Sequence, residues 1–228
     1  MKPSVALSIA FAACFNVATA HYRWTSLIVN DDVTSPYEYV RENSPNYNSP
    51  ITDLSSDDLR CNEGTMAKAA STKVYDVKAG DTIGMALDQA IFHPGPILAY
   101  MSKAPGDVTE YDGSGEWFKV SELGPTFSSG QINWPASNRD RYTFTLPSET
   151  PSGQYLFRME HIALHSAGAP QLYMSCAQVN VQGASSGSPG PTMELPGGYS
   201  MNDPGLKLNI YSPVPTSYDM PGPEVWEG

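Results

Sequence analysis

The stretch Leu172-Tyr173-Met174-Ser175-Cys176-Ala177-Gln178-Val179-Asn180-Val181 decides the fold class. Apolar residues recur at alternate positions along it, and aromatic and β-branched residues are frequent. Successive side chains of a strand point to opposite faces, so this period of two predicts a β-strand. Its length is ample for one strand of a sheet.

Similar signals occur on both sides of this stretch. Strands are predicted at residues 24–29, 73–77, 82–87, 141–146 and 153–159, and more weakly at residues 206–211. The turn at residues 78–81 predicts that the strands beside it form a hairpin. The 20 Pro and 19 Gly punctuate the chain, and long loops are predicted at residues 31–50, 105–130 and from 185 onward. This spacing predicts an all-β, antiparallel β-sandwich with long surface loops, on whose surface the tail is wrapped.

The first twenty residues have the features of a secretory signal peptide. Lys2 precedes an apolar run at residues 5–15, and small residues follow at 18–20. The run is too short to span a membrane. We therefore expect residues 1–20 to be a signal peptide, residues 21–228 to be a single domain, and the protein to be secreted and extracellular. His21 would then be the first residue of the mature chain.

Charge and cysteine content narrow the possible partners and the compartment. The 228 residues carry a net charge of −11; without Lys2, 12 basic residues face 24 acidic ones, a net of −12. Such a charge argues against nucleic acids and anionic membranes as partners. Cys14 leaves with the signal peptide, so a disulfide between Cys61 and Cys176 is the default expectation for a secreted chain.

The four histidines are the main candidates for metal chemistry. A terminal His21 offers its α-amine and a ring nitrogen, and a nitrogen from His93 would complete an N₃ set that suits copper. Alternatively, His21 stands at the terminus only as a by-product of cleavage, and His93 is an ordinary loop histidine. His161 and His165 have the spacing of a zinc HExxH site, but Ile162 stands where that motif needs glutamate, so this interpretation is weak.

Two further polar residues follow on the predicted strand. Gln171 and Tyr173 are two positions apart and therefore lie on one face. A tyrosine oxygen is a plausible weak axial metal ligand, with the histidine and glutamine beside it as hydrogen-bonding groups. A buried core tyrosine and a strand-end glutamine are the alternative interpretation.

Together these segments resemble the fungal auxiliary activity family 9 lytic polysaccharide monooxygenases, formerly grouped with the family 61 glycosidases. The resemblance runs over essentially the whole mature chain, and its most specific block is residues 160–165 with 171–178. The other matching segments are residues 21–22, 50–53, 59–61, 77–82, 92–95, 115–119, 151–156, 204–211 and 221–228. The segment between His165 and Gln171 is short and carries Pro170 in place of a small residue, a departure that can move both side chains.

The resemblance implies an immunoglobulin-like β-sandwich and specific roles for several residues. His21 and His93 would form a histidine brace that holds one copper ion, with Tyr173 in the axial position. His165 and Gln171 would lie beside the bound oxygen species, and His161 would be structural. The cysteine pair matches a family disulfide. Surface aromatic positions of the family, which would stack on sugar rings, correspond to Tyr47, Phe92 and Tyr199.

The implied activity is oxidative cleavage of cellulose or a related β-1,4-glucan at C1 or C4. It would use O₂ or H₂O₂ and an external electron donor, such as cellobiose dehydrogenase or a small phenolic or ascorbate reductant. A monomeric catalytic domain without a carbohydrate-binding module is expected. A non-catalytic secreted copper-binding protein with the same brace is the alternative, and a hydrolytic endoglucanase is a third possibility.

Overall fold

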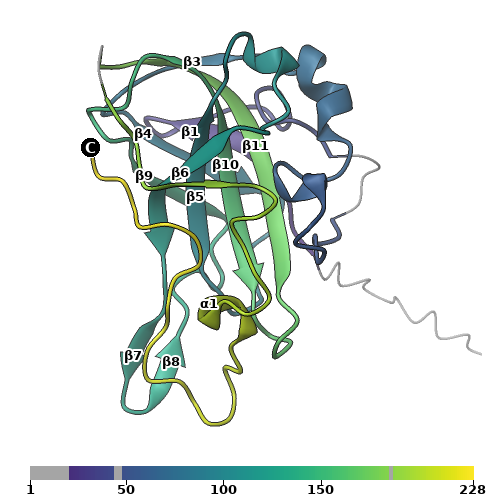
Figure 1. Cartoon of the computed structure of the whole chain (residues 1–228), viewed down its shortest axis with the longest axis vertical. Helices are drawn as coiled ribbons and strands as arrows, with labels where there is room; N and C mark the ends of the chain where they lie inside the picture. The colour runs from purple at the N-terminus through teal and green to yellow at the C-terminus, as the bar shows by residue number, and fades with distance from the viewer. Residues whose placement is uncertain (1–20, 44–47, 185–186) are drawn as a thin grey trace, which may run out of the picture.

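A computed structural model describes residues 21–43, 48–184 and 187–228 of the chain. The expected signal peptide at residues 1–20 lies outside these described residues. Within them, the strands form two main sheets that pack face to face, with long connections around them (Figure 1). The predicted all-β sandwich is confirmed.

The smaller main sheet has the strand order β2-β1-β4-β9 and is antiparallel. Its strands are β1 (Trp24–Val29), β2 (Asp32–Val33), β4 (Thr82–Leu87) and β9 (Arg141–Thr145). The sequence pattern predicted β1 and β4 with these same bounds. Every residue of β1 is buried, because it lies between two neighbours and under the second sheet.

The larger sheet has the order β12-β6-β5-β10-β11-β3. Its strands are β12 (Thr192–Glu194), β6 (Glu116–Leu123), β5 (Ile97–Lys103), β10 (Gly153–Ala163), β11 (Gln171–Gln182) and β3 (Tyr75–Lys78). Its pairs are antiparallel except β11 with β3, which run parallel. A separate hairpin, β7 (Thr126–Ser128) with β8 (Gln131–Asn133), projects from the end of the sandwich (Figure 1).

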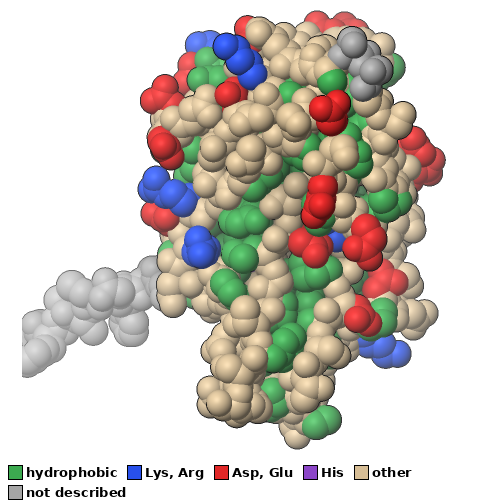
Figure 2. All heavy atoms as spheres, turned by 90° about the vertical axis from the view of Figure 1, so that its left-hand side faces the viewer, with side chains coloured by type: hydrophobic (Ala, Val, Ile, Leu, Met, Phe, Trp, Pro, Cys, Tyr) green, Lys and Arg blue, Asp and Glu red, His purple; other side chains and the backbone are tan. Residues whose placement is uncertain are grey.

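Short helical turns and the tail complete the fold. Three 3₁₀ turns are η1 (Asp57–Leu59), η2 (Thr65–Ser71) and η3 (Val108–Glu110), and one short helix, α1 (Pro204–Lys207), lies in the tail. The weak strand signal at residues 206–211 is therefore wrong, since this segment contains α1 and irregular chain. The expected wrapping of the tail is confirmed, because Leu195, Leu206 and Ile210 are buried against the large sheet. Acidic side chains are spread over the face in Figure 2.

The large sheet is covered on both faces, which explains its nearly continuous burial. Along β10, Tyr155 and Phe157 enter the core between the two sheets, whereas Leu156 enters a second core beneath the tail. This is the alternation expected of a strand.

The predicted hairpin of residues 73–77 with 82–87 is wrong. Its first strand pairs with β11 and its second with β1 and β9, so the turn at residues 78–81 crosses between sheets.

Candidate functional site

The candidate site lies at one end of the core between the sheets, where the chain enters β1 and β11. Tyr173 projects into this core and is only 2% exposed. The indole Nε1 of Trp24 donates a hydrogen bond to the Tyr173 carbonyl at 3.2 Å. This bond ties the first strand to β11 across the core and fixes the position of His21, three residues before Trp24.

The segment around His21 is held by the loop that follows β4. Asp88 accepts hydrogen bonds from the backbone nitrogen of Arg23 at 2.8 Å and from its Nε at 2.9 Å. The His21 carbonyl accepts from Asn48 Nδ2 at 3.0 Å and from the Gln89 side chain. His21 is half-buried, and these contacts hold its backbone in place at the surface.

The loop that carries His93 is docked on the end of β10. The backbone nitrogen of Leu164 donates to the Pro94 carbonyl at 2.9 Å, and that of Ile162 donates to Pro96 at 3.1 Å. A Cβ atom built on Gly95 would lie 1.8 Å from the Ile162 carbonyl oxygen, so only glycine permits this close approach. The docking brings His93 next to the turn that follows β10.

The predicted polar residues are brought together at this place. The ring of Tyr173 lies 5.9 Å from that of His21 and 6.3 Å from that of His93, measured between centroids. The rings of His93 and His165 stack, with centroids 3.8 Å apart. The Tyr173 hydroxyl donates to Gln171 Oε1 at 2.9 Å. The short segment with Pro170 therefore leaves Gln171 in contact with Tyr173.

Burial and neighbouring charge shift the pKa values at the site. Burial, followed by the neighbouring His21, lowers the pKa of His165 below the usual range. Burial raises the pKa of the Tyr173 hydroxyl. Near neutral pH, His165 is therefore a neutral imidazole and Tyr173 a protonated phenol. A neutral imidazole carries one N–H donor and one lone pair, so it can both give and accept a proton.

His161 has a structural place, as expected. It is completely buried on β10, directly opposite Tyr173 on β11. Its Nδ1 forms a 2.6 Å hydrogen bond with the hydroxyl of Tyr22. The Tyr22 ring in turn packs on Tyr173 at 4.6 Å. Because His161 lies on a strand and His165 in the turn after it, their four-residue spacing does not place them on one helical face.

The aromatic residues expected at the surface have three different outcomes. Phe92 is 46% exposed beside His93, so its ring is available for stacking, and its binding role stays a prediction. Tyr47 lies outside the described residues. The expected surface position of Tyr199 is wrong. Its side chain is only 5% exposed, and its hydroxyl donates to the buried carboxylate of Glu160 at 2.7 Å. This polar partner draws the ring inward, so Tyr199 offers no face to a ligand.

Sequence analysis missed Tyr211, which is exposed next to the site. Its side chain is 58% exposed, and its hydroxyl donates to the His165 carbonyl at 3.1 Å. The residue lies in a Pro-rich loop of the tail, and its place depends on the wrapping of that tail. A tyrosine in a polar, proline-rich loop was the only local signal for it.

The donor set at this site fits a metal that prefers nitrogen ligands. Two imidazoles and a phenol oxygen suit copper, zinc or iron. The Nδ1 atom of His165 is buried and has no hydrogen-bond partner among the described residues, so the site contains an unused polar atom. No group of three or more His, Cys, Asp or Glu side chains gathers as a metal site in that part of the chain. A metal at His21 and His93 would therefore need a further donor, and the main-chain amine of a terminal His21 is suited to this.

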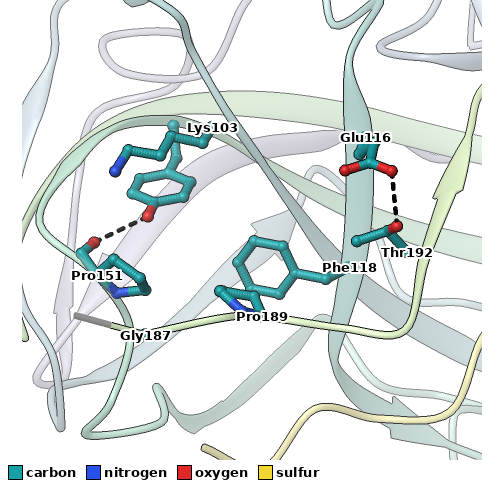
Figure 3. A pocket seen from close by; sticks show the side chains of 8 residues that line it. Lys103, Glu116, Phe118, Pro151, Gly187, Pro189 and Thr192 are labelled. Atoms are coloured by element: carbon teal, nitrogen blue, oxygen red, sulfur yellow. Dashed lines mark hydrogen bonds between the residues drawn. The ribbon is translucent and has the colours of Figure 1, made fainter.

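A separate hollow of about 370 Å³ lies away from the histidines. It is bordered by β5, β6, β10 and the segment before β12 (Figure 3). Its lining includes Lys103, Glu116, Phe118, Tyr155 and Thr192. None of the candidate metal ligands lines it, so we do not assign the histidine chemistry to this hollow.

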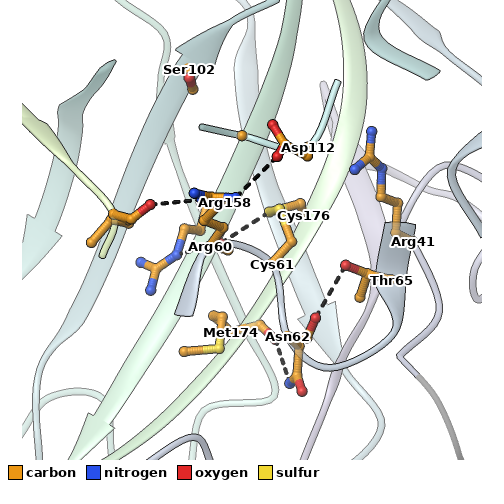
Figure 4. The surroundings of a disulfide bond; sticks show 12 residues. Arg41, Arg60, Cys61, Asn62, Thr65, Ser102, Asp112, Arg158, Met174 and Cys176 are labelled. Carbon is orange, nitrogen blue, oxygen red and sulfur yellow. Dashed lines mark hydrogen bonds and ion pairs between the residues drawn. A yellow bond between two sulfur atoms is a disulfide. The ribbon is translucent and has the colours of Figure 1, made fainter. Parts of the chain in front are cut away.

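The predicted disulfide is present. Cys61 and Cys176 are bonded and 115 residues apart in sequence (Figure 4). The neighbouring Asn62 donates from Nδ2 to the Met174 carbonyl at 3.0 Å, which holds the same loop against β11. In the chain-entropy model, closing so long a loop stabilises the fold by about 4–5 kcal/mol. The bond holds β11 in place at Cys176, three residues along the strand from Tyr173.

The family model of Auxiliary Activity family 9 (formerly GH61) matches residues 21–218, starting at His21. The chain belongs to this family. It is 46% identical over 216 residues to "AA9 family lytic polysaccharide monooxygenase C" of Emericella nidulans, covering 92% of this chain and 94% of that protein.

Solved structures of the family have the same fold. The crystal structure of HiLPMO9B superimposes with a TM-score of 0.81 at 30% identity, covering 91% of this chain and 100% of that one. A cellulose-active polysaccharide monooxygenase from M. thermophila gives a TM-score of 0.79 at 30% identity with the same coverage. The immunoglobulin-like sandwich predicted from the family resemblance is confirmed for this member of the family.

No helix in the described part of this family 9 chain is long and apolar enough to span a membrane.

Proposed function

We propose that this family 9 member is a copper-dependent lytic polysaccharide monooxygenase that cleaves β-1,4-glucan, with cellulose as its first candidate substrate. The observation that carries the proposal is the convergence of His21 and His93 about the ring of Tyr173, at 5.9 Å and 6.3 Å. Product analysis distinguishes oxidation at C1, at C4 or at both. The cellulose activity of the M. thermophila relative supports this choice of substrate.

His21 and His93 would hold the copper ion, with the phenol of Tyr173 as a further oxygen donor beside them. Copper in such a site would supply one-electron redox chemistry and activate O₂ or H₂O₂. The site requires cleavage after Ala20, because only then does His21 possess an α-amine in place of a peptide nitrogen. The start of the family match at His21 supports this processing.

The surrounding residues would orient the reaction and move protons. Tyr173 stays protonated because burial raises its pKa, and its hydroxyl is held by Gln171 at 2.9 Å. His165, neutral because its pKa is lowered, would hold a proton on one ring nitrogen and a lone pair on the other, so it can donate a proton at the site and accept one in return. Phe92 and Tyr211 are exposed beside these residues and would stack on glucose rings.

The same proposal covers location and partners. Residues 1–20 would direct secretion, and residues 21–228 would act as one catalytic domain and as a monomer. The buried disulfide is what an oxidising, extracellular environment permits. Electrons would come from outside the chain, either from cellobiose dehydrogenase or from a small phenolic or ascorbate reductant.

Product analysis tests the proposed function. Processed protein that begins at His21 and is loaded with copper should release oxidised cello-oligosaccharides from cellulose when ascorbate is added, as measured by mass spectrometry. His93→Ala should lose this release while keeping its thermal unfolding midpoint. Copper binding without oxidised products would favour the non-catalytic copper-binding alternative. Products with reducing ends only, unaffected by a chelator, would instead indicate a hydrolase.

A further inference from the structure

The buried guanidinium of Arg41 makes hydrogen bonds of unequal strength. The residue is only 1% exposed. Its Nε donates to Gln178 Oε1 at 2.8 Å, and its Nη2 donates to the carbonyls of Val108 and Tyr111 at 2.7 and 2.8 Å. The remaining nitrogen, Nη1, donates to the thioether sulfur of Met66 at 3.7 Å. A thioether is a weak acceptor, so one side of this buried cation has only a poor partner.

The charge of Arg41 is not balanced by a carboxylate in direct contact. Among the described residues, no Asp or Glu forms an ion pair with it. Burial lowers its pKa to about 10, and the more distant charge of Asp112 opposes this only in part. A buried charge gains most from a hydrogen bond with a strong acceptor. Nη1 is therefore the position at which a better acceptor would stabilise the protein.

The sulfur of Met66 can be reached from solvent. Met66 lies on η2 and is 43% exposed. Together with Arg41 and Thr65 it borders a hollow of about 310 Å³ beside the disulfide, where Figure 4 shows Arg41 and Thr65. Asp58 and Asp112 border the same hollow, so it does not suit an anion. A small neutral molecule such as hydrogen peroxide fits there.

Hydrogen peroxide oxidises an accessible methionine sulfur to the sulfoxide. A sulfur lone pair attacks one peroxide oxygen, so the S–O bond forms while the O–O bond breaks and hydroxide leaves. The hydroxide then takes the proton of the transferred oxygen, and the products are methionine sulfoxide and water. The sulfur loses two electrons and the peroxide gains them. The sulfoxide oxygen is a polar acceptor, whereas the original thioether is a weak one.

We propose that Met66 is a site of modification by hydrogen peroxide, and that its sulfoxide oxygen accepts a hydrogen bond from Nη1 of Arg41. Oxidation replaces the weakest hydrogen bond of the buried guanidinium with a charge-assisted one. A sulfoxide commonly disrupts the packing of the protein that carries it. This one instead joins η2 more firmly to β11, because Arg41 also holds Gln178.

The Met66 site is separate from the histidines. Gln178 lies five residues along β11 from Tyr173, which is about 17 Å at the rise of a strand. Peroxide therefore reaches Met66 by diffusion, and the reaction requires neither the proposed metal nor the proposed function.

Dilute hydrogen peroxide tests the inference on processed, copper-loaded protein without reductant, and on the same protein with a chelator. Met201 is the matched control, because it is also 43% exposed but makes no hydrogen bond to an arginine among the described residues. Peptide mass spectrometry should find one added oxygen on Met66 in Met201→Leu and on Met201 in Met66→Leu. Oxidation should raise the thermal unfolding midpoint of Met201→Leu by about 2–4 °C, the effect of a net gain of one hydrogen bond. It should not raise that of Met66→Leu.

A second pair of variants tests the acceptor without an oxidant. Met66→Gln offers an amide oxygen to Nη1 of Arg41, whereas Met66→Leu offers no acceptor, so the first should unfold about 2–4 °C above the second. Met201→Gln and Met201→Leu should unfold at nearly the same temperature, as is usual for exchanges at exposed positions.

Each outcome supports or overturns the inference. Met66 that stays reduced while Met201 is oxidised would overturn it, and so would oxidised Met66 with an unchanged or lower unfolding midpoint. Oxidation of Met66 only in the copper-loaded protein would assign the step to the metal and overturn the direct reaction. Equal midpoints of Met66→Gln and Met66→Leu would contradict the hydrogen bond to Arg41. Oxidation with the expected rise would support the site whether or not the protein releases oxidised sugars.

Discussion

The imidazole ring of His165 lies stacked on that of His93, with planes 12° apart and centroids 3.8 Å apart. His93 comes from the loop between β4 and β5, whereas His165 comes from the turn between β10 and β11. Two backbone hydrogen bonds dock the first loop on the end of β10 and so enforce this stacking. A proposed metal ligand and a proposed proton carrier are thus positioned by the same contact.

Replacement of His165 should separate catalysis from metal binding. His165→Ala removes the neutral imidazole but leaves both proposed nitrogen ligands, so release of oxidised products should fall roughly 100-fold. Copper affinity, measured by calorimetry, should change less than about tenfold. Tyr211→Phe removes only the hydrogen bond to the His165 carbonyl and should have a much smaller effect. Unchanged product release from His165→Ala would contradict the assigned proton transfer.

The buried pair Arg158–Glu160 should contribute strongly to stability. Both side chains are fully buried and joined by a 2.7 Å contact, and Tyr199 donates to the same carboxylate. Glu160→Gln leaves the Arg158 charge unpaired, so the free energy of unfolding should fall by about 3–5 kcal/mol in urea titrations.

The surface pair Lys73–Glu38 provides the matched control. Its 3.0 Å contact joins side chains that are 66% and 30% exposed. Glu38→Gln should therefore lower the free energy of unfolding by no more than about 1 kcal/mol. Equal losses of unfolding free energy in the two variants would mean that burial does not determine how much stability is lost when the Arg158–Glu160 pair is broken.

Local pattern predicted the strands well because alternation is a property of the strand itself. It predicted β1 and β4 with their observed bounds, and it placed Gln171 and Tyr173 on one face, where they now share a hydrogen bond. The family resemblance, rather than periodicity, supplied the grouping of His21 with His93. That grouping depends on the docking of the His93 loop on the end of β10, which is far from both histidines in sequence.

The wrong predictions depended on contacts between distant segments. A turn signal at residues 78–81 was interpreted as a hairpin, but turn chemistry does not reveal that the next strand belongs to another sheet. Tyr199 was expected at the surface because it corresponds to a surface aromatic position of the family. Its burial depends on Glu160, which is 39 residues away and itself buried by β-sheet packing.

Acid should destabilise the protein partly through His161. Complete burial, followed by the charge of His93, lowers its pKa from 6.5 to about 3. A base whose folded pKa is depressed contributes stability above its unfolded pKa, and this contribution is lost as the pH falls from about 6.5 towards 3. The loss should be on the order of 4 kcal/mol. His161→Gln, which can still accept from Tyr22 but does not titrate, should flatten this part of the urea-unfolding profile. An identical pH dependence in both proteins would contradict the assignment.

The free amine of His21 should decide metal affinity. His21 and His93 supply two ring nitrogens, and no cluster of three or more potential side-chain ligands is found among the described residues. We propose the main-chain amine of a terminal His21 as the third nitrogen donor. Protein that begins at His21 should bind copper roughly 100-fold or more tightly than the same protein with its α-amine acetylated, because acetylation converts the amine into an amide, which is a much poorer metal ligand.

Calorimetry and electron paramagnetic resonance of the two copper-loaded proteins measure this difference. The matched pair differs by a single acetyl group at the N-terminus, so both proteins should unfold at the same temperature without metal. Only the form with the free amine should show the spectrum of a tetragonal site with three nitrogen ligands. Equal affinities and equal spectra would exclude the amine as a ligand. Metal binding would then have to be explained with His165, the imidazole that already lies against His93.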